Sequence, residues 1–328
     1  MEKTIRERFN EEILAVARRR YGLAEDALQE LGGFESFMYG FAQEGGEYIL
    51  RIGHSRRRSV NMIRGEVDWI NYLAAGGAGV ARAVPSPNGE LVEVLPDGQG
   101  DDFLATAFVR AKGGHVRREM WNEAFWVEYG RFIGNLHALT KNYTPSQPEW
   151  RRPEWNDPIF LEIGWLPESE ELVRQRYEAL LAYLTALPRG RESYGLVHQD
   201  AHRGNFFVDE AGKITLFDFD DCYYSWFAYD IAMVIFYAIT NEPEADALAR
   251  RFFQQFRRGY EQENYLDPVW YKEIPHFLKL REIDLYAVIH RSFDLDNLND
   301  SWVGRFMQGR KERIENDVPY VRGWESEE

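Results

Sequence analysis

The 328-residue chain contains a single cysteine, Cys222. An intrachain disulfide is therefore impossible, and a cysteine-rich zinc site is excluded as well. Positive charge is also scarce, because 39 lysines and arginines stand against 54 aspartates and glutamates, a formal net charge of −15. This excess of acids disfavours nucleic acid or an anionic membrane surface as a partner. It is compatible with a cationic ligand.

Long hydrophobic runs are missing too. The longest, IAMVIFYAI at residues 231–239, is too short to cross a bilayer and is typical of a buried helix. The N-terminal MEKTIRERFNEE has no apolar core, so we do not expect it to act as a secretory signal. With a single cysteine, these features predict a cytoplasmic protein without a membrane partner. The length exceeds that of a usual single core, which favours two lobes.

The first part of the chain has mainly strand patterns. Residues 5–20 have the apolar spacing of a helix. ALQELGG, FESFMYGFAQ and EYILRIG predict strands, with an EGGE turn between the last two. A helix is expected over residues 59–75, capped by Ser59 and ended by Gly76–Gly77.

Two further strand signals precede a change of pattern. PSPNGELVEVLP predicts a hairpin around Asn88–Gly89, and DDFLATAFVRAKGG predicts one more strand. From Glu119 onward most of the chain has helical patterns. We therefore expect an α+β fold with a β-rich first lobe and a mainly helical second lobe, joined near residues 108–112.

The stretch GLVHQDAHRGNFFVDEAGKITLFDFDD, residues 195–221, combines ionisable residues with apolar strands. GLV, FFV and ITLF predict short strands around the loop HQDAHRGN and the turn DEAGK, so DFDD returns alongside the loop. Asp200, Asn205 and Asp218 are thereby expected to converge. Their oxygens suit Mg²⁺, and a carboxylate free of the metal can act as a base. The alternative is an acidic hairpin at a solvated edge, which the apolar strands disfavour.

HQDAHRGN fits the pattern H-x-D-x-x-x-x-N, and DFD stands where protein kinases have their metal-binding D-F-G. The chain resembles the aminoglycoside phosphotransferase and choline kinase family, the small-molecule branch of the kinase-like fold. The resemblance implies that Asp200 is the catalytic aspartate. It implies that Asn205 and Asp218, with Asp220 as a further candidate, hold Mg²⁺ on the phosphates of ATP or GTP.

The resemblance also assigns a nucleotide-binding lobe, residues 1–109. The loop LGGFESFMYGF offers Gly32, Gly33 and Ser36 to the phosphates. Arg51 occupies the place of the usual strand lysine, and arginine also grips phosphate. Its expected acid partner is Glu66, with Asp68 as the lesser candidate. The adenine hinge is expected at Phe108, Val109 and Arg110.

The remainder, residues 110–328, is expected to form the catalytic and acceptor-binding lobe. His198 is implied to be a scaffold residue that hydrogen-bonds neighbouring backbone. Asp230, at the start of the apolar helix, is implied to support the catalytic loop, although a plain helix N-terminal acid is the alternative. His137 is predicted to be a packed structural histidine.

The acceptor site is predicted between the short segment DCYYSWFAY and the helices of the second lobe. This segment, without a following A-P-E, argues for a small acceptor and against a protein kinase. An ammonium group can be bound by aromatic and acidic side chains. The alternative is that these aromatics are core and these acids a solvated helix end. The candidates are Tyr223, Tyr224, Trp226, Phe227, Asp294, Asp296 and Asp300.

The predicted function is therefore ATP-dependent phosphorylation of a hydroxyl on a small, cationic molecule of the aminoglycoside or amino-alcohol type. A homoserine or sugar kinase of the same fold is an alternative. A second alternative is a pseudokinase that binds nucleotide without turnover. Arg51, and Gln199 where the family frequently has glycine, are the departures that favour the pseudokinase. The sequence leaves the oligomeric state open.

Overall fold

The computed structural model describes residues 2–298 and 301–324. The chain divides into two compact units. The first, here the sheet unit, comprises Met1–His115, Asn142–Arg152 and Phe206–Asp220. The second, here the helical unit, comprises Val116–Lys141, Pro153–Asn205 and Asp221–Glu328. No helix within the described residues is long and apolar enough to cross a membrane.

The sheet unit is built on one antiparallel sheet with the strand order β1-β2-β3-β6-β4, and β5 also pairs with β6. A separate hairpin, β8 and β9, is attached to this unit by the bridges Val80–Leu216 and Gly114–Val208. The elements of the sheet unit are α1 (Lys3–Arg8), α2 (Glu11–Arg20), β1 (Gln29–Glu30), β2 (Phe37–Gln43), β3 (Gly46–His54), α3 (Val60–Ala75), β4 (Ala83–Val84), β5 (Glu93–Pro96), β6 (Asp102–Val109), η2 (Pro148–Trp150), β8 (Phe206–Val208) and β9 (Ile214–Leu216).

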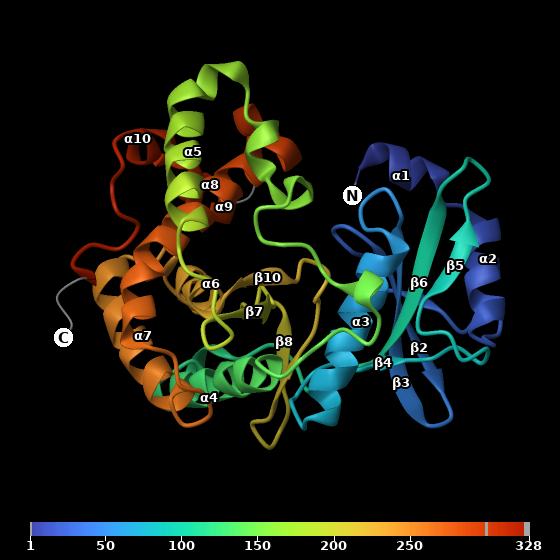
Figure 1. Cartoon of the computed structure of the whole chain (residues 1–328). Helices are drawn as coiled ribbons and strands as arrows, with labels where there is room; N and C mark the ends of the chain where they lie inside the picture. Colours follow the sequence, from blue (N-terminus) through green and yellow to red (C-terminus); the bar gives the residue numbers. More distant parts are fainter. Residues whose placement is uncertain (1, 299–300, 325–328) are drawn as a thin grey trace. The chain divides into compact units, whose positions relative to one another are not determined.

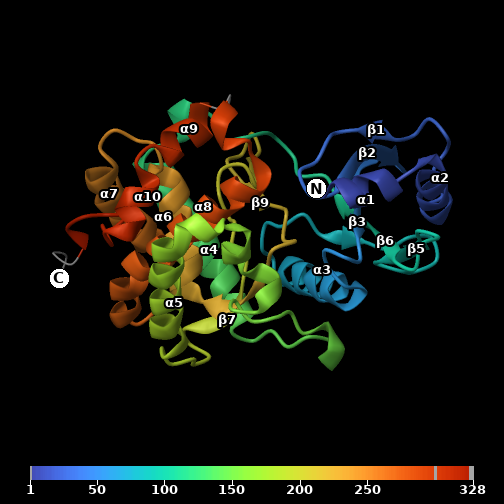
Figure 2. The same ribbon diagram turned by 90° about the horizontal axis from the view of Figure 1, so that it is seen from above.

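One face of this sheet carries hydrophobic core residues, and the opposite face carries Arg51. Side chains alternate between faces along a strand. Leu50 and Ile52 of β3 therefore join the core formed with Ile13 and Ala17 of α2, whereas Arg51 points to the opposite face. Figures 1 and 2 show α2 and α3 on these opposite faces. The hydrophobic core thus fixes Arg51 on the side of α3.

Most of the expected elements of the sheet unit are present, and two are corrected. The helix expected over residues 5–20 is two helices, α1 and α2. Phe9 leaves the helix and stacks on Phe37 at 3.8 Å. The Asn10 side chain then caps α2 by accepting the N–H of Ile13 at 3.1 Å. The Asn10 cap and the contact between the Phe9 and Phe37 rings stabilise a break between α1 and α2 more than a continuous helix would be stabilised by the apolar spacing.

The second correction concerns the hairpin expected around Asn88–Gly89. The turn exists, with Gly89 at φ 84° and the N–H of Ser86 donating to Glu90 at 2.8 Å. However, β5 pairs with β6 rather than with the residues before the turn. Pro85 and Pro87 lack the N–H that such a ladder requires.

The helical unit is organised around closely packed helix pairs. Gly130 of α4 and Gly259 of α7 permit this closeness, because a Cβ at either would lie 1.8 Å from a carbonyl oxygen of the other helix. The buried α6 packs on α8. The elements are η1 (Arg118–Met120), α4 (Glu123–Thr140), η3 (Pro158–Phe160), η4 (Glu162–Trp165), η5 (Glu168–Glu170), α5 (Glu171–Thr185), β7 (Tyr194–Val197), β10 (Tyr223–Trp226), α6 (Phe227–Ile239), α7 (Ala245–Tyr260), η6 (Pro268–Glu273), α8 (Ile274–Ser292), η7 (Leu295–Asn297), α9 (Ser301–Met307) and α10 (Arg310–Glu315).

Candidate active site

The sheet unit contains a cavity of about 380 Å³ between the sheet, α3 and the β8–β9 hairpin. Its wall is mainly apolar, with Arg51, Glu66, Arg110 and Asp218 contributing charge. Such a combination suits a ligand with a flat apolar part and a charged end. The lining residues are Leu31, Gly32, Met38, Ile49, Arg51, Glu66, Ile70, Ala81, Phe108, Val109, Arg110, Ala111, Phe207, Phe217, Asp218 and Phe219.

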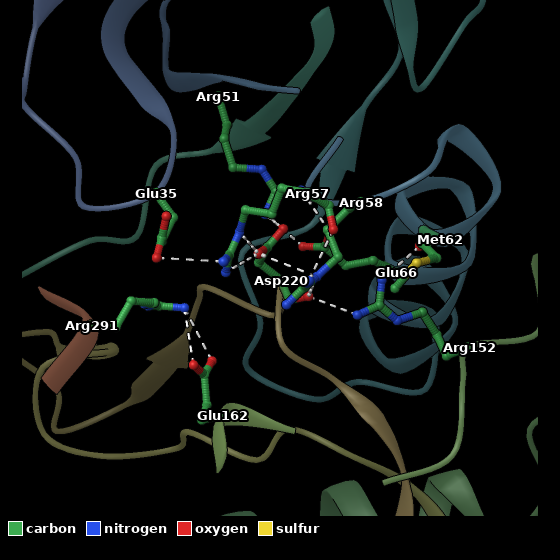
Figure 3. Close-up of polar contacts among 10 residues, drawn as sticks. All are labelled: Glu35, Arg51, Arg57, Arg58, Met62, Glu66, Arg152, Glu162, Asp220 and Arg291. Carbon is green, nitrogen blue, oxygen red and sulfur yellow. Dashed lines mark hydrogen bonds and ion pairs between the residues drawn. The ribbon is translucent and has the colours of Figure 1, made fainter. Parts of the chain in front are cut away.

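Arg51 forms the ion pair that the sequence analysis expected. Its two terminal nitrogens donate to the carboxylate oxygens of Glu66 at 2.8 and 2.6 Å, as Figure 3 shows. Both residues are buried, and the guanidinium also lies 5.0 Å from the centre of the Phe108 ring. Asp68, the lesser candidate, instead accepts hydrogen bonds from Tyr143 and Ser146. The pairing holds Arg51 rigidly at the cavity wall.

The loop before β2 has a shape that requires glycine. Gly32 has φ 72°, and a Cβ on Gly33 would lie 2.0 Å from the carbonyl oxygen of Ser36. Gly32 lines the large cavity, and Ser36 lines a small neighbouring recess with Arg51 and Arg57. Glu35 of this loop lies 3.5 Å from Arg57. The loop is thereby tied to the start of α3.

Asp220 is surrounded by arginines, of which only Arg51 was predicted from the sequence as a site residue (Figure 3). Arg57 donates to its carboxylate at 2.8 and 3.1 Å, Arg58 lies 3.8 Å away, and Arg51 lies 3.9 Å away. Arg152 donates to its carbonyl oxygen at 2.7 Å. Burial raises the pKa of Asp220, but the charges of Arg57, Arg58 and Arg51 outweigh it and hold the pKa well below its usual range. The run SRRRS at residues 55–59 was the available sequence signal.

In the helical unit, Asp230 fixes the backbone of the loop at residues 198–205. It accepts the N–H groups of His198 and Gln199 at 3.1 and 2.8 Å. His137 contacts its carboxylate at 3.1 Å and the Tyr260 hydroxyl at 2.9 Å. His198 accepts the N–H of Asp200 at 3.2 Å. Two of these contacts have the geometry that the resemblance implied, a backbone-bonding His198 and a supporting Asp230.

Asp200 and Asn205 lie together at the end of this loop. The Asn205 amide nitrogen donates to the Asp200 carbonyl and carboxylate oxygens at 2.9 and 3.0 Å. Arg281 donates to Oδ1 of Asp200 at 3.2 Å. The Nε2 atom of His202 lies 3.3 Å from Oδ2 of Asp200. Burial raises the pKa of Asp200, but His202 and Arg281 outweigh it and hold the pKa well below its usual range. An ionised carboxylate is therefore present at neutral pH.

Asp218 belongs to the sheet unit, and Asn205 belongs to the helical unit. Asp218 has φ 65°, in the left-handed region that aspartate tolerates better than most residues. It lines the large cavity with Arg51. The convergence of Asp200, Asn205 and Asp218 stays a prediction.

The residues proposed from sequence for the acceptor are divided between core and surface. Tyr223 and Trp226 are buried because β10, a strand that the sequence pattern did not predict, pairs with β7 and carries them into the core. Phe227, the first residue of α6, is buried as well. Asp294 and Asp296 are exposed at η7. Asp294 accepts the N–H of Asp296 at 3.1 Å. Tyr224 is half-buried, and Asp300 lies outside the described residues.

Comparisons with known proteins show which family the chain belongs to. The profile of the phosphotransferase enzyme family matches residues 27–266. Amicoumacin kinase of Bacillus subtilis (strain 168) is 39% identical over 323 residues, covering 97% of this chain and 96% of that protein. A homoserine kinase of Pseudomonas aeruginosa (strain LESB58) is 27% identical over 207 residues, covering 62% of this chain and 61% of that protein.

Solved structures extend the comparison to the fold. The amicoumacin kinase hAmiN, in complex with AMP-PNP, Ca²⁺ and Ami, is 34% identical with a TM-score of 0.93, and each chain is covered to 99%. A microcompartment-associated aminopropanol kinase is 22% identical with a TM-score of 0.74, covering 94% of this chain and 98% of that one. The fold is that of kinase-like phosphotransferases, with a β-sheet lobe and a helical lobe. The chain belongs to the phosphotransferase enzyme family and is a small-molecule kinase.

Proposed function

We propose that the chain transfers the terminal phosphoryl group of ATP to a hydroxyl of a small cationic acceptor. The observation that carries this proposal is an ionised Asp200 on a loop whose backbone Asp230 fixes. An ionised carboxylate can orient an acceptor hydroxyl and take up its proton as the oxygen attacks phosphorus. Phosphoryl transfer also requires that the phosphates are positioned and that their charge is neutralised. Arg51, which Glu66 holds at the cavity wall, is suited to this role.

The large cavity of the sheet unit supports ATP as the donor. Apolar side chains such as Ile49, Ile70 and Phe217 offer walls for a purine ring. Backbone groups at residues 108–110 are the proposed hinge, and Arg51 is the proposed phosphate ligand. Gly32, Gly33 and Ser36 are proposed to cover the phosphates. AMP-PNP in the hAmiN complex favours an adenine nucleotide over GTP.

The donor atoms fit a divalent metal. The Asn205 amide nitrogen is committed to Asp200, which leaves its amide oxygen as the atom for a cation. With Asp218 this gives two hard oxygen ligands, the kind that Mg²⁺ prefers. Bound Mg²⁺ would neutralise phosphate charge. Asp220 is engaged by arginines, so we propose that Asn205 and Asp218, rather than Asp220, are the metal ligands.

The first acceptor to test is amicoumacin, because two relatives above 30% identity are named as amicoumacin kinases. The experiment measures ADP release and phosphorus-NMR signals of phosphomonoesters with amicoumacin, 1-amino-2-propanol, homoserine and an aminoglycoside. We expect turnover of amicoumacin that requires both ATP and Mg²⁺. Turnover of homoserine alone would favour the homoserine kinase alternative. ATP binding without phosphorylation of any acceptor would overturn the proposal in favour of a pseudokinase.

A further inference from the structure

Gln199, the residue before Asp200, has an unfavourable backbone conformation. Its φ of 74° lies in the left-handed region, which glycine adopts freely and glutamine does not. The N–H bond to Asp230 at 2.8 Å holds the backbone there. Only 8% of the residue is exposed, so the long amide side chain is directed into the protein. A strained position that carries a buried polar side chain points to a use for that side chain.

The amide oxygen of Gln199 is one of several buried polar atoms without a partner. Among the residues that the structure describes, its Oε1 has no hydrogen bond, and the same is true of the Tyr229 hydroxyl, the Tyr177 hydroxyl and Asp284 Oδ1. Buried polar atoms of this kind are rare, because each forfeits its bonds to water. Several of them together indicate a site for a polar ligand.

These atoms belong to one cluster. Burial raises the pKa of Tyr229, and the charge of Asp284 raises it further, whereas Arg281, the Tyr223 hydroxyl and the Gln199 amide lower it. Burial likewise raises the pKa of Tyr177, again reinforced by Asp284. The Tyr229 hydroxyl therefore lies near both Gln199 and Asp284, and the Tyr177 hydroxyl lies near Asp284. Among the described residues these approaches are too poorly aligned to satisfy Gln199 Oε1, Asp284 Oδ1 or either hydroxyl with a well-formed hydrogen bond.

The cluster adjoins the proposed reaction centre within the helical unit. Gln199 precedes Asp200 in the chain. Arg281 of α8 donates to Asp200 Oδ1 at 3.2 Å, and Asp284 follows Arg281 by three residues, on the same face of the helix. A ligand held by Gln199 and Asp284 would therefore lie beside Asp200.

The charged residues around Asp284 indicate which kind of ligand this cluster would bind. Arg281 is engaged by Asp200 and the Tyr237 hydroxyl. Glu162, the other nearby acid, is paired with Arg291 at 3.1 and 3.2 Å (Figure 3). Asp284 has no salt bridge among the described residues. Its site therefore carries an uncompensated acid that a cation can neutralise.

The pKa of Asp284 is consistent with a site for a cation. Burial raises its pKa to about 7, Arg281 opposes the rise, and Glu162 adds to it. The other groups that face it are the hydroxyls of Tyr177, Tyr229 and Tyr223. A bound cation would keep the carboxylate ionised.

We propose that Gln199 Oε1, the Tyr229 hydroxyl and Asp284 form the subsite that binds the ammonium group of an amino-alcohol acceptor, with the acceptor hydroxyl at Asp200. A primary ammonium has three N–H donors, and these three groups supply three acceptors. This inference rests on the proposed phosphoryl transfer and specifies its substrate class.

The test compares the wild type with Asp284→Asn, Gln199→Gly and Tyr229→Phe, using the best acceptor of the panel and its N-acetyl derivative. We expect Asp284→Asn to raise the acceptor KM about 10- to 100-fold, the worth of a charged hydrogen bond, with the ATP KM unchanged. Gln199→Gly should raise the acceptor KM about tenfold with an unchanged or higher Tm. The preference of the wild type for the free amine over the N-acetyl derivative should shrink in Asp284→Asn.

Two controls separate this inference from the proposed function. Glu178→Gln removes an exposed acid of α5 that no proposal involves and should keep the wild-type KM. Calorimetric titration of the panel amines reports binding without turnover. Amine binding that weakens in Asp284→Asn, without phosphorylation, would support the subsite and reject the transfer. An unchanged acceptor KM in both Asp284→Asn and Gln199→Gly, a parallel loss of ATP affinity, or no binding of any amine would overturn the subsite.

Discussion

Arg57 donates from two nitrogens to one carboxylate oxygen of Asp220, at 2.8 and 3.1 Å, although 163 residues separate them in the chain. The same guanidinium lies 3.5 Å from Glu35. Arg57 thus connects the glycine-containing loop with the segment that follows β9, both within the sheet unit.

Removing Arg57 should therefore disturb nucleotide binding. We expect Arg57→Ala to raise the ATP KM about tenfold, because about 1–2 kcal/mol of hydrogen bonding that positions the loop is lost. Arg56→Ala is the matched control, because Arg56 is exposed and pairs with Asp101 instead. Equal ATP KM values for Arg57→Ala and the wild type in steady-state kinetics would contradict the positioning role.

Asp200 is expected to act on the chemical step. Asp200→Asn keeps the shape of the side chain and removes its charge, so kcat should fall about 10²- to 10⁴-fold. Calorimetric ATP affinity should change little. Because the pKa of Asp200 is depressed, this carboxylate should not titrate between pH 6 and 8, and should impose no loss of kcat there. A collapse of ATP affinity in step with kcat would make Asp200 a nucleotide or metal residue.

The metal-ligand proposal predicts one effect for substitutions of Asn205 and Asp218 and a different effect for a substitution of Asp220. Asn205→Ala and Asp218→Ala should lose turnover and require far more Mg²⁺ for what remains, while staying folded by circular dichroism. Asp220→Asn should instead lower stability with a near wild-type Mg²⁺ requirement, because its partners are arginines. The measurement is the reaction rate as a function of Mg²⁺ concentration for each variant. An unchanged Mg²⁺ requirement in both alanine variants would falsify the assignment of Asn205 and Asp218 as metal ligands.

Asp230 should stabilise the fold in a pH-dependent way. Burial raises its pKa, but His137 and the Gln199 N–H outweigh this and lower it. A depressed folded-state pKa adds stability above the unfolded pKa of about 4 and loses it as pH falls. Asp230→Asn should cost about 3 kcal/mol at pH 7 and less near pH 4, measured by urea unfolding.

A surface acid provides the comparison for Asp230. Glu128 is 62% exposed and lies 3.9 Å from Arg131, so Glu128→Gln should change stability by less than about 0.5 kcal/mol. The same loss for Asp230→Asn at pH 4 and pH 7 would show that its contribution is not linked to ionisation.

Local sequence determined much of this protein. The Ser59 cap of α3, the turn between β2 and β3, and the β8–β9 hairpin follow from neighbouring residues whose hydrogen bonds are short in range. The pattern H-x-D-x-x-x-x-N likewise placed Asp200 and Asn205 on one short loop, where they hydrogen-bond each other. The family resemblance, with a cation in the strand at Arg51 and an acid on the next helix at Glu66, predicted their pairing.

Only the tertiary structure decided which distant side chains share a site. The arginines around Asp220, Arg281 beside Asp200, and the group of Gln199, Tyr229 and Asp284 come from segments far apart in the chain. Likewise, Tyr223 and Trp226 had the composition of a ligand surface, yet pairing of β10 with β7 buries them. Periodicity specifies which face of a segment is buried, but the packing of segments against one another decides which polar side chain that face meets.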